Sequence, residues 1–355
     1  MHSLRSARRD HSQHSQVLLR REAALATGSG TRRDSGLLTV IGAINWDISV
    51  FEERFARPGE EVPVRQVEEF SGGKGANVAV ACARILGGGR VAFIGALGED
   101  ELAARQLSSL RDEGVLTDGT VEVKGARSGR AYIIVDSNGR KTIHTHFGAN
   151  ERITPREISS EGASRILQRT RMMIVMDPPT RVALAVARAA KGRGARVVYS
   201  PGVRTQEGFR SIEGVIRLSD YVALDSHEVR NLYPARDDRS AVERLERAYP
   251  KLTVVTTLGP RGCIVARDGV TSMIEGVDLS SLGKRAVNST GSGDAFLGVF
   301  ASYLLMGRNP LDAANLANIA GALKATRFET RGSPTRGELE ATRARLEKVR
   351  RSRRG

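Results

Sequence analysis

Short runs that are almost wholly apolar recur from residue 37 onwards and alternate with segments of helical length. The predicted strands cover residues 37–44, 90–98, 171–177, 195–202, 220–225 and 252–259. The predicted helices cover residues 75–86, 100–114, 180–194, 294–307 and 310–326. Strands that are apolar on both faces and separated by helices predict an α/β fold, with a mainly parallel sheet covered by helices on both sides.

Two segments follow a different pattern. Residues 60–70 and 129–146 alternate polar and apolar positions with period two, and Asn138-Gly139 is a strong hairpin signal. We expect them to form a small antiparallel sheet with one solvent-facing side. Because this sheet is inserted between βα units, it is placed to act as a lid.

The sequence predicts three regions. Residues 1–36 are poor in apolar residues and rich in Ser, Arg and His, which predicts a disordered basic tail or a mis-assigned start. Residues 37–334 are expected to form one domain, with lid segments near 50–70 and 120–147. Residues 335–355 are expected to form a surface helix that ends in a basic tail.

The net charge of +15 is concentrated at the two ends of the chain. Residues 1–36 carry seven Arg against three acidic residues, and residues 336–355 carry eight Arg or Lys against three. Few aromatic residues interleave with these cations, which argues against nucleic acid as the main partner.

The two cysteines and the length of the apolar runs bear on location. Cys82 and Cys263 stand alone in apolar contexts, which predicts buried thiols in a reducing cytoplasm. No apolar run approaches the roughly 18 residues of a membrane span. We therefore expect a cytoplasmic protein without a membrane partner.

The stretch "SGGKGANVA" (residues 71–79) is a candidate ligand site. Its glycines allow a ligand close to the backbone, and Asn77 can both donate and accept hydrogen bonds. It is not a Walker A loop, because Lys74 is followed by Gly75 where Ser or Thr must hold magnesium. The alternative is a glycine-rich helix start that serves packing alone.

The stretch "GAINWD" places Asp47 just beyond a buried strand, where open α/β sheets bind ligands. A carboxylate at this position can accept hydrogen bonds from two adjacent sugar hydroxyls. The alternative is an Asp that only forms a turn.

The stretch "NSTGSGDAF" (residues 288–296) is the most informative. Gly291, Ser292 and Gly293 offer successive backbone N–H groups at a helix start, which is typical of an anion site. The run carries no Lys and ends in Asp294, a carboxylate that phosphate would repel. Asp294 could instead be a favourable charge at the helix N-terminus.

These three motifs resemble, in order and spacing, those of the ribokinase-like family of sugar kinases, also called the phosphofructokinase-B family. "GAINWD" is similar to the family's opening strand, "GGKGAN" to its first signature, and "NSTGSGDAF" to its second, usually written DTTGAGDAF. The resemblance covers about residues 37–334. It implies a three-layer αβα sandwich with a small antiparallel β lid, and ATP-dependent phosphoryl transfer to a sugar hydroxyl.

The resemblance also implies residue roles. Asp294 would be the general base, and Gly291, Ser292 and Gly293 would form the anion hole for the phosphoryl group. Glu228 would organise Mg²⁺, through water. The sugar pocket would be lined by Asp47, Gly72, Gly73, Lys74 and Asn77. The nucleotide would be bound by Asp225, Thr257, Gly259, Gly262 and Asn318.

Two residues depart from the family pattern. Asn288 replaces an Asp that in many relatives helps to bind an activating monovalent cation, so dependence on potassium is left open. Asp225 stands where the family has Asn and adds a negative charge near the nucleotide phosphates, which Mg²⁺ could offset. Lid sheets in this family often pair across a dimer, so the resemblance also suggests a homodimer that covers the exposed sheet edges.

The substrate is predicted from the cations of the lid region. These cations exceed what a neutral sugar needs, and Arg forks suit a phosphate already on the substrate. The prediction is fructose 6-phosphate, with Arg130 as a substrate ligand; the alternatives are ribose or a nucleoside. The alternative to a phosphate site is that an Arg-rich protein has Arg on all its solvent-exposed surfaces, so that these cations bind no substrate. The cations are Arg57, Arg65, Arg127, Arg130, Arg140, Lys141, His144 and His146.

Two further alternatives concern metals and a different class of protein. His144 and His146 share one strand face, and without a third ligand nearby we expect them to face the substrate rather than bind a metal. A ribokinase-like fold could also serve as a non-catalytic nucleic-acid-binding or regulatory protein through its basic ends. The intact Asp294 argues against that function.

Overall fold

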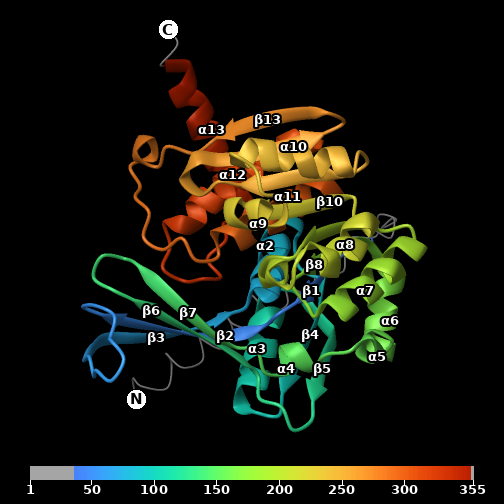
Figure 1. Cartoon of the computed structure of the whole chain (residues 1–355), viewed down its shortest axis with the longest axis vertical. Helices are drawn as coiled ribbons and strands as arrows, with labels where there is room; N and C mark the ends of the chain where they lie inside the picture. Colours follow the sequence, from blue (N-terminus) through green and yellow to red (C-terminus); the bar gives the residue numbers. More distant parts are fainter. Residues whose placement is uncertain (1–35, 353–355) are drawn as a thin grey trace, which may run out of the picture. The chain divides into compact units, whose positions relative to one another are not determined.

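The main sheet of the computed structural model, which describes residues 36–352, has nine strands (Figure 1). They are β1 (Leu37–Gly42), β4 (Val91–Gly98), β5 (Leu116–Val123), β8 (Thr170–Met176), β9 (Arg196–Ser200), β10 (Tyr221–Asp225), β11 (Thr253–Thr257), β12 (Gly262–Arg267) and β13 (Val270–Glu275). Their order is β13-β12-β11-β10-β9-β8-β1-β4-β5. The pairs from β11 to β5 are parallel, and β11–β12 and β12–β13 are antiparallel. The predicted mainly parallel sheet is confirmed. The predicted tail lies, apart from residue 36, outside the described residues.

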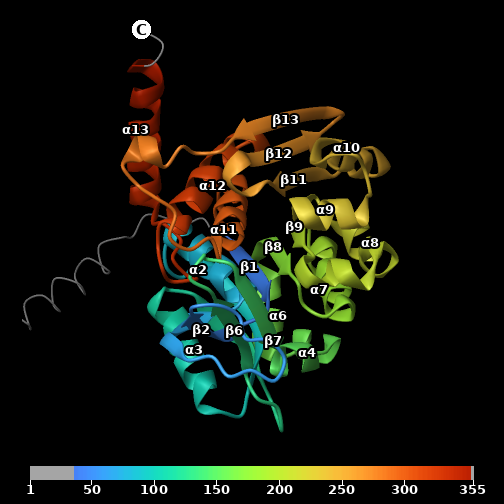
Figure 2. The same cartoon turned by 60° about the vertical axis from the view of Figure 1, so that its left-hand side comes forward.

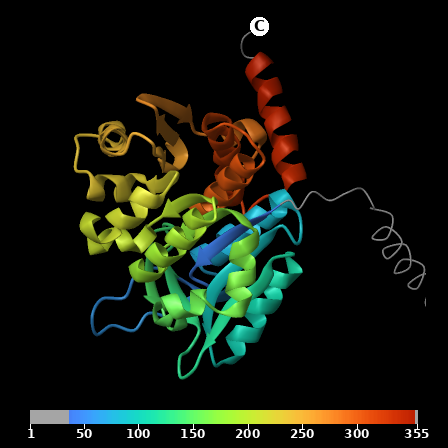
Figure 3. The same ribbon diagram turned by 90° about the vertical axis from the view of Figure 1, so that its right-hand side faces the viewer.

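Helices cover both faces of this sheet, as Figure 3 shows. Leu38 and Val40 of β1 join one hydrophobic cluster, and Leu37 and Ile41 join the other, because side chains alternate along a strand. The first cluster packs under α2 (Lys74–Leu86), α3 (Glu101–Asp112), α11 (Ser292–Leu305), α12 (Pro310–Ala325) and α13 (Arg336–Ser352). The second packs under α4 (Ala149–Arg152), α5 (Pro155–Ile158), α6 (Glu161–Arg169), α7 (Thr180–Gly192), α8 (Phe209–Leu218), α9 (Ser226–Leu232) and α10 (Asp238–Ala248). The predicted αβα sandwich is confirmed. Within the described part of the chain, no helix is both long and apolar enough to cross a membrane.

A second sheet of four strands forms the lid (Figure 2). Its strands are β2 (Asn45–Glu52), β3 (Val64–Gly72), β6 (Gly129–Val135) and β7 (Lys141–His146), in the order β3-β2-β6-β7. The β6–β7 pair forms the predicted antiparallel hairpin. Strand β2 was not predicted; it pairs antiparallel with β3 and parallel with β6. The reason is that β2 and β6 both run outward from the main sheet, following β1 and β5, while β3 and β7 return.

The residues "NWD" belong to this lid. The sequence predicts that they follow the first buried strand as a polar end, whereas β1 stops at Gly42 and Asn45 already begins a second strand, β2. Asp47 therefore lies on a lid strand, close to the carboxyl edge of the main sheet. Cys82 and Cys263 are both buried and unpaired, in agreement with their apolar surroundings.

Helices α2 and α11 pack unusually closely. A Cβ atom at Gly298 of α11 would lie 2.5 Å from the Ala81 Cβ and 2.9 Å from the Val78 carbonyl oxygen of α2. The Cys82 thiol donates to the Gly298 carbonyl oxygen at 3.4 Å. The two glycine-rich motifs, each at the start of one of these helices, are brought together by this contact.

The close contact predicts opposite effects of one substitution at two helical glycines. Gly298→Ala should lower the free energy of unfolding by about 1–3 kcal/mol, because the added methyl group overpacks the α2–α11 contact. Gly337→Ala is the matched control: nothing lies within 4 Å of its Cβ position in α13, so it should gain about 0.5–1 kcal/mol. Chemical denaturation measures both, and equal effects of the two variants would contradict the packing argument.

Candidate active site

A cleft of 390 Å³ opens where the carboxyl edge of the main sheet meets the lid. Its lining comes from β2, β6 and β7 of the lid, from the ends of β8 to β11, and from the starts of α2 and α11. Ten of the predicted site residues line it: Asp47, Gly73, Lys74, Asn77, Asp225, Glu228, Thr257, Gly291, Gly293 and Asp294. Motifs more than 200 residues apart in the sequence therefore meet in one cleft.

A second cavity of 230 Å³ adjoins the first. The two share Thr257, Ser289, Gly293 and Phe296, so they meet at the glycine-rich turn. The lining of the second cavity is mostly apolar, which suits a flat aromatic ring. Six predicted residues line it: Thr257, Gly259, Gly262, Ser292, Gly293 and Asn318. The Asn318 side chain donates to the Glu275 carbonyl oxygen at 2.7 Å.

The turn before α11 has the geometry of an anion site. Gly291 is the N-cap of α11 with φ 82°, and a Cβ atom there would lie 2.1 Å from the Thr330 carbonyl oxygen, so only glycine fits. The N–H groups of Gly293 and Asp294 belong to the first helical turn, whose donors have no acceptor within the helix. The Ser292 N–H is already bonded to the Ser289 carbonyl oxygen at 3.1 Å. Gly293 and Asp294 are thus the better-placed donors.

Asp294 is buried and held by a second motif. Its Oδ2 accepts a hydrogen bond of 2.9 Å from the Asn77 amide, and Asn77 Oδ1 accepts one of 3.3 Å from Arg331 Nε. Burial raises the pKa of Asp294 to about 6, against the opposing effects of the Asn77 hydrogen bond and the Lys74 charge. A carboxylate with a pKa near the working pH is suited to accept a proton.

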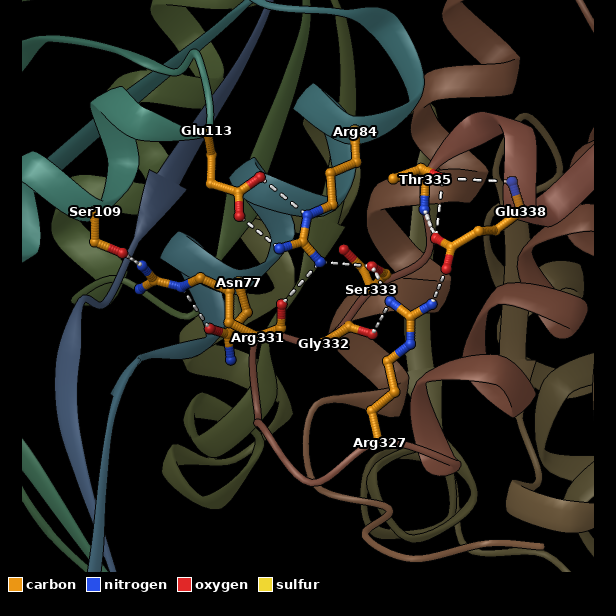
Figure 4. A network of polar contacts seen from close by, with 10 residues as sticks. All are labelled: Asn77, Arg84, Ser109, Glu113, Arg327, Arg331, Gly332, Ser333, Thr335 and Glu338. Atoms are coloured by element: carbon orange, nitrogen blue, oxygen red, sulfur yellow. Dashed lines mark hydrogen bonds and ion pairs between the residues drawn. The ribbon is translucent and has the colours of Figure 1, made fainter. Parts of the chain in front are cut away.

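The Arg331 side chain contacts β3, α2 and α3, and Figure 4 shows its hydrogen bonds to Asn77 and Ser109. Besides Asn77, its guanidinium donates to Ser109 Oγ and to the Gly72 carbonyl oxygen, each at 2.9 Å. Arg331 is only 8% exposed and has no carboxylate partner in these contacts. Burial therefore lowers its pKa to about 10, while the charge of Asp47 opposes that effect.

Arg331 lies in the loop of residues 326–335, which we call the strap. Two more arginines hold this loop in place. Arg84 of α2 donates to the Arg331 and Ser333 carbonyl oxygens at 3.2 and 2.6 Å, and its guanidinium is also paired with Glu113 (Figure 4). Arg327 donates to the carbonyl oxygens of Gly332 and Ser333 at 3.2 and 3.0 Å. The strap is thus held by backbone acceptors rather than by apolar packing alone.

The strap also positions Asp47. Thr330 Oγ1 donates to Asp47 Oδ2 at 3.0 Å. Gly72 does not line the cleft, but a Cβ atom there would lie 2.0 Å from Asp47 Oδ2, so its missing side chain makes room for the carboxylate. Burial raises the pKa of Asp47 to about 7, although Thr330 and Arg331 oppose the shift.

Asp225 and Glu228 have a structural role besides lining the cleft. They form a capping box at the start of α9: Asp225 Oδ1 accepts from the Glu228 N–H at 2.7 Å, and Glu228 Oε2 accepts from the Asp225 N–H at 2.9 Å. Burial and the nearby charge of Asp225 raise the pKa of Glu228 to about 7. The other carboxylate oxygens, Asp225 Oδ2 and Glu228 Oε1, take no part in the capping box.

Lys74 is paired with an acid that the sequence analysis did not single out. Lys74 Nζ lies 3.4 Å from Oδ2 of Asp177, a buried residue with φ 44°. Burial raises the pKa of Asp177, while Lys74 and Arg204 lower it. The available signal was an acidic residue directly after the apolar run 172–176.

Most of the lid cations do not line the cleft. Of the eight predicted, Lys141 lines it and donates to Thr290 Oγ1 at 2.7 Å. Arg130, predicted to bind substrate, lines neither cavity and lies 3.8 Å from Asp100 Oδ2. Arg65 is paired with Glu53, and Arg140 with Asp136.

The prediction that His144 and His146 face the substrate is wrong. Lys141, Ile143 and Thr145 of β7 line the cleft, and because side chains alternate along a strand the two histidines point to the other side. Among the described residues, no group of three or more His, Cys, Asp or Glu side chains could hold a metal on its own.

Comparison with known proteins gives one consistent relationship. Residues 35–336 match the model of the family described as pfkB family carbohydrate kinase. The ribokinase of Haemophilus influenzae is 29% identical over 309 residues, which are 85% of this chain and 96% of that protein. An ATP-dependent ribose-1-phosphate kinase of Halopiger xanaduensis is 27% identical over 301 residues, covering 84% of this chain and 95% of that protein. The ribokinase structure from Thermotoga maritima has a TM-score of 0.74 and 25% identity, and covers 86% of this chain and 98% of that one. The ribokinase-like fold is confirmed.

The buried Asp294 predicts a pH-dependent cost in stability. Its folded pKa of about 6 lies above the ordinary 3.8, so the folded state binds more protons and the free energy of unfolding falls as pH rises through that window. Asp294→Asn removes the cost and should stabilise the protein by up to about 3 kcal/mol at about pH 8. The gain should shrink towards pH 3.8.

Denaturant unfolding across that pH range measures the effect. The exposed carboxylate of Asp118 provides the control, since Asp118→Asn should show no such pH-dependent gain. A loss of stability in Asp294→Asn at about pH 8 would mean that the carboxylate is better accommodated than its burial indicates.

Proposed function

Because this chain belongs to the pfkB family of carbohydrate kinases, we propose that it is a ribokinase, which transfers the γ-phosphoryl group of ATP to a hydroxyl of ribose. The relatives named ribokinase support this choice over the predicted fructose 6-phosphate. A physical reason points the same way: Arg130 and Arg140, which suggested a phosphorylated substrate, are paired with Asp100 and Asp136.

The polar lining of the cleft supports a neutral sugar. Asn45, Asp47 and Asn77 offer amide and carboxylate groups that can bind hydroxyls, and they lie beside Asp294. Lys141 and Lys74 are the cations of this lining, and Lys74 is already paired with Asp177. A phosphate on the sugar would be expected to meet an Arg fork instead.

In the proposed mechanism, Asp294 takes the proton of the attacking sugar hydroxyl. Asn77 and Arg331 hold the carboxylate in one orientation. The N–H groups of Gly293 and Asp294 stabilise the negative charge of the phosphoryl group, and the lid excludes competing water. A base so placed contributes about 10²- to 10⁴-fold to the rate.

ATP and Mg²⁺ are assigned to the other half of the site. The apolar cavity beside Thr257, Gly259 and Asn318 would take the base. Asp225 Oδ2 and Glu228 Oε1 remain outside the capping box, so these oxygens fit Mg²⁺ held through its water ligands. Bound Mg²⁺ would neutralise charge on the phosphates.

The proposal keeps the domain boundaries and the homodimer of the sequence analysis. Val64 and Val67 of β3 and Tyr132 of β6 are exposed on the lid, at 50%, 51% and 40%. A second lid packed on them would cover this apolar surface and the sheet edges. Sedimentation equilibrium should then give twice the chain mass, and a monomer would exclude the arrangement.

A second candidate substrate is a ribose phosphate. Lys141 is the specific observation, because its ammonium lines the sugar side of the cleft and could bind a phosphate on the sugar. One relative is a ribose-1-phosphate kinase. If ribose is the substrate, Lys141→Met should leave the KM for ribose within about threefold of the wild-type value. If ribose 1-phosphate is the substrate, the same substitution should raise the KM for ribose 1-phosphate by about tenfold or more.

Kinase assays over ribose, ribose 1-phosphate, fructose 6-phosphate, fructose, adenosine and inosine test the proposal. We expect the highest kcat/KM for ribose. A clear preference for fructose 6-phosphate or for a nucleoside would overturn the substrate choice while leaving the family assignment intact.

Asp294→Asn tests the mechanism in the same assay. Turnover should fall by about 10²-fold or more, with ATP affinity within about threefold of the wild type. Near-normal turnover would remove Asp294 from the role of base. Asp118→Asn again serves as the exposed control and should retain full activity.

A further inference from the structure

Lys324 is a fully buried lysine that the proposed mechanism does not use. It lies in the last turn of α12 with 0% exposure. Its Nζ donates to the carbonyl oxygens of Asn288 at 2.9 Å and of Arg327 at 3.4 Å. Among the described residues, Lys74 and Lys191 form ion pairs with aspartates, whereas Lys324 forms none. Its charge is therefore held by neutral oxygens, which is a costly arrangement for a group that serves packing alone.

The ammonium joins the glycine-rich turn to the strap. Asn288 opens the turn, Arg327 lies in the strap, and the Cβ position of Gly291 is 3.5 Å from Lys324 Cε. Two more contacts hold Asn288. Its Nδ2 donates to the Phe328 carbonyl oxygen of the strap at 2.8 Å, and its N–H donates to the Ala325 carbonyl oxygen at the end of α12 at 3.1 Å. Lys324 thus lies directly behind the N-cap of α11.

Lys324 keeps a pKa above neutral pH, although its burial lowers that pKa. Burial lowers the pKa of Lys324 to about 8, and the charges of Lys141 and Arg327 act in the same direction. The negative charges of Asp294 and Glu329 oppose this effect. The Asn288 side chain is uncharged, so the turn itself does not cancel the ammonium.

Main-chain carbonyl oxygens are also the ligands that replace the hydration shell of K⁺ in selectivity filters. A lysine ammonium satisfies the same oxygens with N–H donors and, unlike a free ion, is attached to the chain. A cation in this position would attract the oxygens of a phosphoryl group at the start of α11.

We propose that the Lys324 ammonium is a built-in monovalent cation, which fixes the turn of residues 288–293 and supplies a tethered positive charge behind the anion hole. Lys324 is a positioning residue, since it contacts backbone oxygens and not substrate. The inference rests on the proposed phosphoryl site. Asn288 left open whether the enzyme depends on an activating monovalent cation. If Lys324 takes the place of that cation, the enzyme should need neither K⁺ nor NH₄⁺ for activity.

The wild-type enzyme gives the first test. Its kcat with ribose and MgATP should change by less than about twofold between tetramethylammonium, sodium, potassium and ammonium chloride at equal ionic strength, so that screening is constant. Activation by K⁺ of about tenfold or more would overturn the proposal.

Two substitutions separate charge from volume. Lys324→Ala should lower kcat in tetramethylammonium chloride by about 10²-fold, and K⁺ or NH₄⁺ should restore about tenfold or more of it by entering the vacated space. Lys324→Met should lose similar activity without rescue, because its thioether fills that space. The exposed Lys284 provides the control, since Lys284→Met should behave like the wild type. A loss that no cation rescues in Lys324→Ala would reduce Lys324 to a packing role.

A readout without turnover separates this inference from the proposed function. The melting temperature of Lys324→Ala should rise in potassium chloride relative to tetramethylammonium chloride, and that of the wild type should not. This comparison decides the role of Lys324 even if the wild type phosphorylates none of the sugars. If Lys324→Ala does not fold, Lys324→Gln replaces it, because the amide can donate to the same carbonyl oxygens without a charge; full activity of that variant would overturn the proposal.

Discussion

The hydrogen bond from Arg331 to Asn77 is the contact on which the geometry of the cleft depends. Asn77 can present either its oxygen or its amide nitrogen to Asp294, and a guanidinium can only donate. Because Arg331 Nε occupies the Asn77 oxygen, the amide nitrogen must point at Asp294. The same guanidinium binds the Gly72 carbonyl oxygen and so fixes the end of the lid strand that leads into α2.

This arrangement buries several charged side chains, which lowers the free energy of unfolding relative to an apolar core. Asp47, Asp177 and Asp294 all have raised pKa values because water is excluded from them, and Lys324 and Arg331 have lowered ones for the same reason. The charges are linked mainly through amides, hydroxyls and carbonyl oxygens instead of direct pairs, with Lys74 and Asp177 as the exception. Such an array costs stability, and clusters of perturbed groups in a cleft are typical of functional sites.

Local pattern and short motifs predicted the layers and most of the cleft. Apolar runs located the strands and period-two alternation located most of the lid. The structure brings the two glycine-rich stretches together, with Asn77 hydrogen-bonded to Asp294. The strap was missed because nothing in "TRFETRGSP" distinguishes Arg331, which is buried, from the many exposed arginines of this chain. Burial of a polar side chain depends on partners far away in sequence, here Gly72, Asn77 and Ser109. For the same reason the lid arginines suggested a phosphate site. Arg130 and Arg140 are in fact paired with Asp100 and Asp136, and the sequence alone does not show these pairs.

A carboxylate can end a phosphate-binding turn because the two functions use different directions of one helical turn. The backbone N–H groups of the first turn point along the axis of α11, towards the junction of the two cavities. The Asp294 side chain leaves the helix sideways and is held against α2 by Asn77. In the proposed mechanism, the Lys324 ammonium offsets the repulsion between this carboxylate and a phosphoryl group, because its positive charge attracts both. The proposed mechanism thus uses a buried cation in addition to the glycines, and the last turn of α12 supplies it as Lys324.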